Sequence, residues 1–251
     1  MKSQDNFLVQ LKNFDHESSI AARYLYAEMA IQHAASKSKK LLNRLNNTPT
    51  FWIACGASFQ SSAYITIARI FDEKSKYNID KLLDSMEQNL HLFQRDALAI
   101  RKREDRTEDP DWLEVYLESA YFPKSNDVVR LRKMVKKYRD IYNRAIMLVR
   151  HNYLAHRGIV DQVEVQKLYS NGTIRELWRL STFLLQLNKI LWEQYHNGRK
   201  PVFRSLRHSV KSIYDAKHQG SSPSESIVSD VKKLMQFMEF AALSIPLKEI
   251  S

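Results

Sequence analysis

Cysteine, glycine and proline are all scarce in this chain of 251 residues, and each scarcity removes a class of protein. Cys55 is the single cysteine, so no intramolecular disulfide can form, and its apolar neighbours indicate a core residue. With only 5 glycines and 6 prolines, the chain lacks the turns that alternating strands and helices need. Frequent Leu, Ala, Lys, Glu and Arg predict an all-α fold with long helices instead.

Long apolar runs and common enzyme motifs are missing as well. No run approaches the roughly 20 apolar residues that a bilayer-spanning helix needs, and residues 1–6 are polar with no signal-peptide core behind them. Neither a P-loop nor a GxGxxG motif is present, and the sequence has no HExxH, no Cys/His ligand spacing and no nucleophile elbow. We therefore expect a cytoplasmic protein that uses no metal and no cofactor.

Positive charge is in excess, because 39 Lys and Arg stand against 28 Asp and Glu, a formal net charge of +11. Such a surplus attracts polyanions, so nucleic acid is the first candidate partner and an anionic membrane the second. The third interpretation is a soluble protein whose excess positive charge serves no binding function. Arg157 and the six cations of the densest basic stretch are the predicted nucleic-acid-binding residues. The six are Arg130, Arg132, Lys133, Lys136, Lys137 and Arg139.

Apolar residues recur at helical spacing along most of the chain. The expected helices span residues 17–46, 49–71, 79–103, 109–122, 126–157 and 173–196, and a last one begins near residue 226. Cap signals support their ends at Thr48-Pro49, Asn78, Thr173 with Glu176, Gly198, and Ser222 with Glu225. The helix at 49–71 is apolar on most faces, so we expect it in the middle of the fold. Residues 159–165 predict an irregular connector or a short hairpin.

The domain organisation follows from these elements. Residues 1–198 are expected to form a helical bundle, 199–218 a basic amphipathic extension, 219–225 a linker, and 226–251 a C-terminal helix and tail. Near the end of the second expected helix, Arg69 and Asp72 are three residues apart and occupy one helix face. They predict either a local ion pair or a pair that orients a nearby site.

Chemistry-bearing side chains gather in residues 150–158 (RHNYLAHRG), near the end of a long helical pattern. In one interpretation Arg150 and Arg157 are only helix-end cations that complement the dipole. In the other, a guanidinium and an imidazole act on an RNA phosphodiester. An imidazole can take the proton from the 2′-hydroxyl, and a guanidinium can stabilise the charge on the phosphorane. Asn152 is four residues from His156, so its amide could orient the ring or the phosphate.

Spacing limits the second interpretation. Arg150 and His156 are six residues apart, which places them about 9 Å apart along a regular helix axis and roughly 120° around it. In one straight helix they do not meet on a single phosphate. Either the helix ends between them, as Gly158 partly indicates, or a second chain of a twofold dimer completes the site. His151 and His156 are five apart, whereas a two-histidine metal face uses a spacing of four.

The stretch from Arg150 to His156 resembles the Arg-x(4–6)-His signature of HEPN domains, including the polar residue that directly follows the Arg. Together with residues 67–72 (IARIFD), it is most similar to the HEPN branch named for the abortive-infection U system. The resemblance covers about residues 20 to 195, and residues after about 198 match nothing that we can name.

The resemblance implies an antiparallel helical bundle that dimerises face to face, with metal-independent endoribonuclease activity in the cleft between the two motifs. Carried over by residue, Arg150 binds the scissile phosphate and His156 transfers protons. The supporting candidates are His151, Asn152, Arg69 and Asp72. Some HEPN proteins are not nucleases, so a non-catalytic module that binds nucleic acid or a protein stays the alternative.

The implied partners are RNA, with tRNA and mRNA both open, a second copy of the chain, and a cognate antitoxin or defence partner. No membrane partner is expected.

Overall fold

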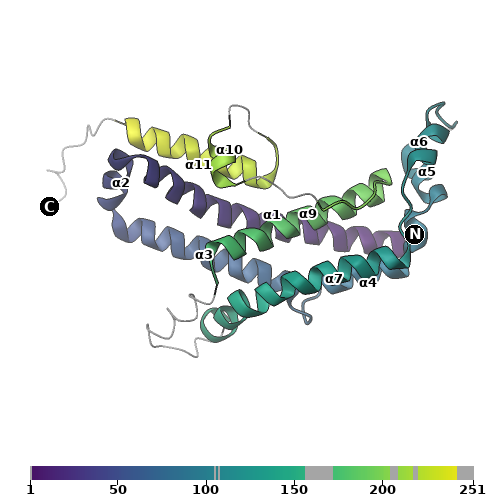
Figure 1. Cartoon of the computed structure of the whole chain (residues 1–251), viewed down its shortest axis with the longest axis horizontal. Helices are drawn as coiled ribbons and strands as arrows, with labels where there is room; N and C mark the ends of the chain where they lie inside the picture. The colour runs from purple at the N-terminus through teal and green to yellow at the C-terminus, as the bar shows by residue number, and fades with distance from the viewer. Residues whose placement is uncertain are drawn as a thin grey trace. The chain divides into compact units, whose positions relative to one another are not determined.

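The computed structural model describes residues 2–104, 106, 108–155, 172–203, 209–216 and 220–241. Helices are the only regular secondary structure in these ranges, which confirms the all-α prediction (Figure 1). They are α1 (Lys2–Lys37), α2 (Lys39–Asn46), α3 (Pro49–Phe71), α4 (Ile79–Gln88), η1 (Leu90–Phe93), α5 (Arg95–Arg103), α6 (Leu113–Ser119), α7 (Ser125–Tyr142), η2 (Asn143–Met147), η3 (Arg150–Ala155), α9 (Ile174–Asn197), α10 (Val210–Tyr214) and α11 (Pro223–Phe240). None of these described helices is long and apolar enough to span a membrane.

The chain divides into two compact units that are interleaved along the sequence. One unit contains Met1–Ala22 and Ala63–Leu206, and the other contains Arg23–Ser62 and Arg207–Ser251. Helices α1 and α3 therefore supply residues to both units. A compact unit need not coincide with a conserved domain, so the predicted boundaries after residues 198, 218 and 225 stay predictions.

Helices α7 and α9 of the first unit pack against each other in opposite directions. Just after α7, Arg144 forms an ion pair with Glu176 at the start of α9 (2.5 Å). Earlier on α7, Tyr138 stacks on Phe183, which lies further along α9, with ring centroids 3.9 Å apart. Because contacts move toward the start of α7 as they move along α9, the pair is antiparallel.

Helix α4 packs against α7 in the same manner. Arg139, late in α7, binds Asp80 at the start of α4 at 2.5 Å. Arg132, earlier in α7, binds Asp84 and Glu87 further along α4 at 2.7 and 2.8 Å. The core between these helices is formed by buried aliphatic side chains, namely Leu82, Leu83 and Met86 of α4 and Val128, Leu131 and Val135 of α7.

The first part of α1 closes the bundle against α9. Phe7 meets Phe93 and Tyr195 with ring centroids 5.0 and 5.3 Å apart. Further along α1, Asp15 accepts a hydrogen bond from Asn188 (2.5 Å), so this pair is antiparallel too. Phe7 is fully buried, and burial of such a side chain stabilises a fold by about 1.5–3 kcal/mol.

The second unit gathers α2, α10 and α11 around residues 23–37 of α1. The Ser38 hydroxyl donates to Glu239 of α11 (2.6 Å), and Lys37 pairs with Asp215, directly after α10 (3.0 Å). The buried residues include Leu41 and Leu45 of α2 and Val231 and Met235 of α11. Within the described part of the predicted extension at 199–218, α10 is the helical segment.

Several predicted helix ends are confirmed. Helix α3 begins at Pro49, and Asn78, Thr173 and Ser222 each accept a hydrogen bond from a backbone amide in the first turn of their helix. Gly198 adopts the left-handed conformation (φ 55°) that closes α9. A Cβ there would lie 2.6 Å from Leu98 Cδ2, so both the backbone and the packing require glycine.

Several predicted helices are wrong in their extent, including the one predicted at residues 109–122, which is the shorter α6 (Leu113–Ser119). Helix α1 starts at Lys2, because Phe7, Leu11 and Phe14 form a buried stripe at i, i+4 and i+7 that the prediction overlooked. It stops before Ser38, whose hydroxyl caps α2. The helix predicted for residues 79–103 is interrupted at Asn89 and at residue 94, which separate α4, η1 and α5. The connector or hairpin predicted at residues 159–165 lies outside the described residues.

The predicted burial of α3 is wrong for its first half. Phe51 and Ile53 are 60% and 72% exposed, and Cys55 is half-buried rather than a core residue. Later in α3, Ile67 is fully buried. Leu234 of α11 is another large apolar side chain that stays 49% exposed. Apolar periodicity identifies helices, but only packing partners decide how much of each helix is covered.

Candidate functional site

The helix that follows α7 changes its hydrogen-bond pattern before it reaches Arg150. Both η2 and η3 are π-helical, so their backbone bonds join residue i to i+5. Such turns are rare and occur frequently at functional sites. The premise of a regular α-helix through residues 150–156 is therefore wrong for the described part, because the π-turn changes the register at Arg150.

Arg150 is anchored by the carboxylate that directly follows α3. Its Nη2 donates to Asp72 Oδ2 at 3.2 Å, and the two side chains are 35% and 23% exposed. The other carboxylate oxygen, Oδ1, accepts from the Lys74 backbone N–H at 3.0 Å. Because both oxygens are engaged, Asp72 holds one orientation and positions the guanidinium. A guanidinium has five N–H donors, so this contact leaves capacity for a second anion.

Arg139 fixes the end of α3 beside this pair. Its guanidinium donates to the Phe71 carbonyl at 2.9 Å and to Asp80, and it lies 5.5 Å from the centre of the Phe71 ring. The Phe71 ring in turn stacks on Tyr142, with centroids 5.1 Å apart. These contacts place Phe71, and with it Asp72, against α7. Arg139 is only 18% exposed, so it contributes to structure more than to a free phosphate surface.

A cavity of about 510 Å³ opens beside the Asp72–Arg150 pair. Its charged lining comprises the cations Lys74, Arg139 and Arg150 and the acids Asp72 and Glu73, and His151 lines it as well. The volume lies in the range of small-molecule sites and is sufficient for one nucleotide. Among the described residues no group of three His, Cys, Asp or Glu is arranged to hold a metal ion.

Tyr142 also lines this cavity, and the sequence did not indicate that. Its side chain is almost fully buried at the end of α7. Burial raises the pKa of its hydroxyl, an effect that Arg150 opposes and Asp72 increases. Tyr142 thus keeps its proton at neutral pH and can donate a hydrogen bond. Only the fold, which brings the end of α3 beside α7, reveals this role.

Arg69 does not form the predicted pair with Asp72. It binds Glu17 of α1 instead, at 2.8 Å, and Asp72 binds Arg150. The spacing rule assumed one helix, but α3 ends at Phe71, and the Asp72 carboxylate turns back onto the Lys74 amide. Asp72 therefore still has the geometry of a residue that orients a nearby site, because it binds Arg150. Arg69 instead supports the packing of α1 on α3.

The other residues of the Arg150 stretch are described only in part. His151 is exposed and lines the cavity, and Asn152 is half-buried in η3. His156 and Arg157 lie outside the described residues. The described structure therefore provides the guanidinium and its support, and the position of the imidazole stays a prediction.

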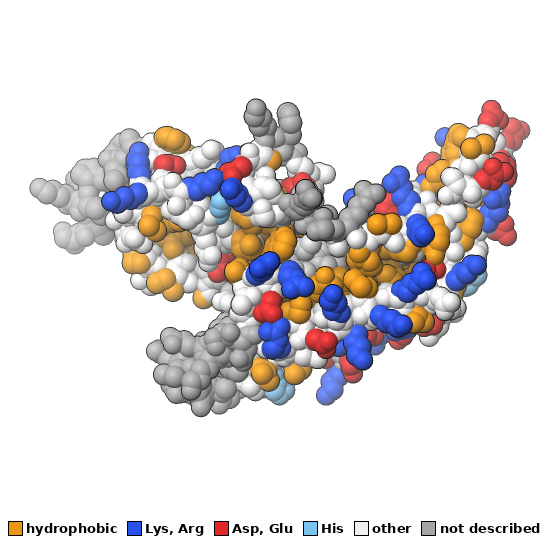
Figure 2. Space-filling model, in the orientation of Figure 1, with side chains coloured by type: hydrophobic (Ala, Val, Ile, Leu, Met, Phe, Trp, Pro, Cys, Tyr) orange, Lys and Arg blue, Asp and Glu red, His pale blue; other side chains and the backbone are white. Residues whose placement is uncertain are grey.

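The basic face of α7 carries less unpaired charge than its sequence suggests. Arg132 and Arg139 bind carboxylates of α4, and Arg130 lies 3.7 Å from Asp127. Figure 2 shows Asp and Glu side chains between the Lys and Arg side chains along this helix. On α7, the exposed cations that pair with no carboxylate of the described residues are Lys133, Lys136 and Lys137.

Comparison with known protein families identifies the family of this chain. The family model HEPN_AbiU2, described as AbiU2, matches residues 4–213, which is most of the chain. The match extends beyond the residues 20–195 over which the sequence resemblance was expected. No curated protein and no solved structure matches the chain.

Proposed function

This chain belongs to the HEPN-type AbiU2 family, and from that premise we propose that it is a metal-independent endoribonuclease acting in phage defence or as a toxin. The observation that carries the proposal is the anchored guanidinium of Arg150. It stands at the rim of a nucleotide-sized cavity, beside a carboxylate whose own orientation is fixed. Preorganised cations of this kind stabilise charge that develops in a transition state.

In the proposed reaction a base removes the proton of a ribose 2′-hydroxyl, and that oxygen attacks the neighbouring phosphorus. The bond to the 5′-oxygen breaks and an acid protonates the leaving oxygen. The products are a 2′,3′-cyclic phosphate and a 5′-hydroxyl. His156 supplies proton transfer, and Arg150 stabilises the phosphorane, as in other acid–base reactions assisted by a cation. Tyr142 and His151 are further donors at the cavity.

We propose that a second copy of the chain completes the site. Arg150 and His156 are six positions apart in the sequence, and that spacing places them on different sides of a single helix. A twofold dimer brings the Arg150 of one protomer toward the His156 of its partner. Exposed Lys133, Lys136 and Lys137 then provide phosphate contacts that hold RNA near this cleft.

One observation favours a second candidate, a non-catalytic HEPN module that binds RNA or a protein. Asp72 already neutralises Arg150, and the cavity as a whole has charges of both signs. A binding module would show RNA affinity that falls steeply with salt and no cleavage.

RNA cleavage in EDTA distinguishes the two candidates. The wild-type chain is expected to cut a mixed tRNA and mRNA substrate at the same rate with and without the chelator, and to leave 2′,3′-cyclic phosphate ends. Salt-dependent RNA binding with no cleavage in either buffer would favour the binding module. Activity that EDTA abolishes would exclude the proposed mechanism.

A further inference from the structure

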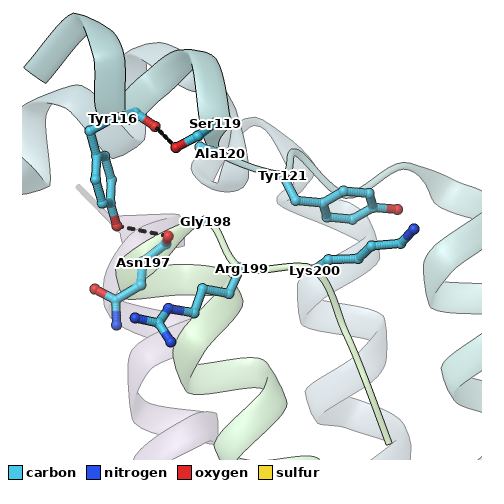
Figure 3. Close-up of a pocket in the computed structure, with 8 residues that line it drawn as sticks. All are labelled: Tyr116, Ser119, Ala120, Tyr121, Asn197, Gly198, Arg199 and Lys200. Carbon is cyan, nitrogen blue, oxygen red and sulfur yellow. Dashed lines mark hydrogen bonds between the residues drawn. The ribbon is translucent and has the colours of Figure 1, made fainter.

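A second cavity, of about 560 Å³, lies in the first unit at the far end of α9. It is formed by the end of α6 with residues 120–121 on one side, and by residues 197–200 on the other (Figure 3). Helix α9 has 24 residues and is therefore about 36 Å long. Its first turn pairs with Arg144, close to the Arg150 stretch, so the two cavities are too far apart to hold the same nucleotide.

Two aromatic rings of this cavity are held in place. Tyr116 donates its hydroxyl hydrogen to the Asn197 carbonyl at 2.8 Å, and the Tyr121 backbone N–H donates to the Gly198 carbonyl at 2.6 Å. Burial raises the pKa of the Tyr121 hydroxyl, and its hydrogen bond to Asp127 adds to that effect. Both tyrosines are thus neutral, half-buried rings that need little ordering before a planar group can stack on them.

Two exposed cations follow Gly198 and line the same cavity. The Arg199 side chain is 74% exposed, and its Nε lies 3.2 Å from Glu193. Lys200 is exposed, and no carboxylate among the described residues pairs with it. In Figure 3 Lys200 and Tyr121, which both line the cavity, extend in the same direction, whereas Arg199 extends the opposite way.

A third cation supports the cavity from behind. Lys102 donates to the Asn197 side-chain oxygen at 2.6 Å, and its ammonium lies 5.2 Å from the centre of the Tyr116 ring. Two cations, Arg199 and Lys200, therefore line the cavity and Lys102 lies next to it, whereas the nearby carboxylates of Glu193 and Asp127 are engaged by Arg199 and Tyr121. A surplus of cations beside neutral aromatic rings is the chemistry that recognises a phosphate joined to a planar base.

We propose that this cavity binds a nucleotide unit, with the base stacked on Tyr121 and the phosphate held by Lys200. The inference does not depend on cleavage at Arg150. A free mononucleotide and a nucleotide within single-stranded RNA share this chemistry. A mononucleotide would make the cavity a sensing site, and an RNA strand would make it a substrate contact remote from the cleavage site.

Binding measurements in EDTA test the proposal with the full-length protein. The probes are AMP, adenosine, inorganic phosphate and a fluorescent single-stranded hexaribonucleotide with 2′-O-methyl groups, which cannot be cleaved by 2′-hydroxyl attack. We expect Lys200→Gln and Tyr121→Leu each to weaken binding of the preferred probe about tenfold or more. Tyr121→Phe keeps the ring and should bind within about twofold of wild type. The matched control is Lys189→Gln, which removes an exposed cation from the same helix, α9.

Tight binding of AMP alone identifies the free nucleotide as the ligand, and tight binding of the oligonucleotide alone identifies RNA. The proposal is overturned if Lys200→Gln binds both as well as wild type does. It is also overturned if inorganic phosphate binds as tightly as AMP, because the base would then contribute nothing. Lys200 is exposed, so Lys200→Gln should not unfold the chain. This variant therefore tests nucleotide binding even if Tyr121→Leu is unstable.

Discussion

Arg150→Ala is expected to lower the rate of RNA cleavage by about 10²- to 10³-fold, which is the typical cost of removing one donor to a developing negative charge. The physical reason is the geometry at the cavity, where Asp72 holds the guanidinium at 3.2 Å while part of its surface stays open. Arg150→Lys should recover only part of the activity, because an ammonium keeps the charge but loses the planar fork. Single-turnover cleavage with saturating enzyme measures the chemical step.

The matched control for Arg150→Ala is Arg95→Ala. Arg95 is 41% exposed and pairs with Glu114, so its exposure and its ion pair resemble those of Arg150. Each half-exposed pair contributes at most about 1 kcal/mol to stability, so both variants should fold. If the two variants cleave RNA at equal rates, Arg150 has no catalytic role.

His156→Ala is expected to lower the same rate by about 10²- to 10⁴-fold, the usual contribution of a positioned acid or base. The prediction rests on the family signature and on the chemistry of imidazole. An imidazole exchanges its proton between about pH 5 and 8, so wild-type cleavage should vary with pH in that range. The variant should lose that dependence together with its activity.

His91→Ala is the control, because His91 is exposed on η1 and belongs to neither cavity. Circular dichroism and RNA affinity should be unchanged in both variants. Cleavage by His156→Ala at the wild-type rate, with an unaltered pH profile, would remove the imidazole from the mechanism.

Local signals predicted much of the fold correctly. Helix caps such as Thr173 and Asn78 act within one turn, and the left-handed Gly198 is equally local, so their residue types were sufficient. The extent of burial was predicted less well. Ile53 has the same apolar character as Ile67 on the same helix, yet one is 72% exposed and the other is buried. The difference depends on which distant segments cover each side chain. The spacing of apolar residues along one helix carries no information about that coverage.

For the candidate site, the sequence predicted which residues take part better than it predicted which of them contact each other. Arg150 and Asp72 were both named, but the partner assigned to Asp72 was Arg69, three residues away. The true pair joins positions 78 residues apart, which only tertiary packing can bring together. The cavity between residues 116–121 and 197–200 was missed for the same reason, since it depends on how segments distant in sequence meet.

In the proposed composite site, one protomer's Arg150 and its partner's His156 act on the same RNA phosphate. The most direct measurement is cleavage in EDTA by a mixed dimer of Arg150→Ala and His156→Ala protomers, isolated through two different affinity tags. One of its two composite sites keeps both groups, so the mixed dimer should cleave at about half the wild-type rate although each parent dimer is inactive. A mixed dimer that forms but stays as inactive as its parents would contradict the composite site, and failure of the two chains to associate would contradict it as well.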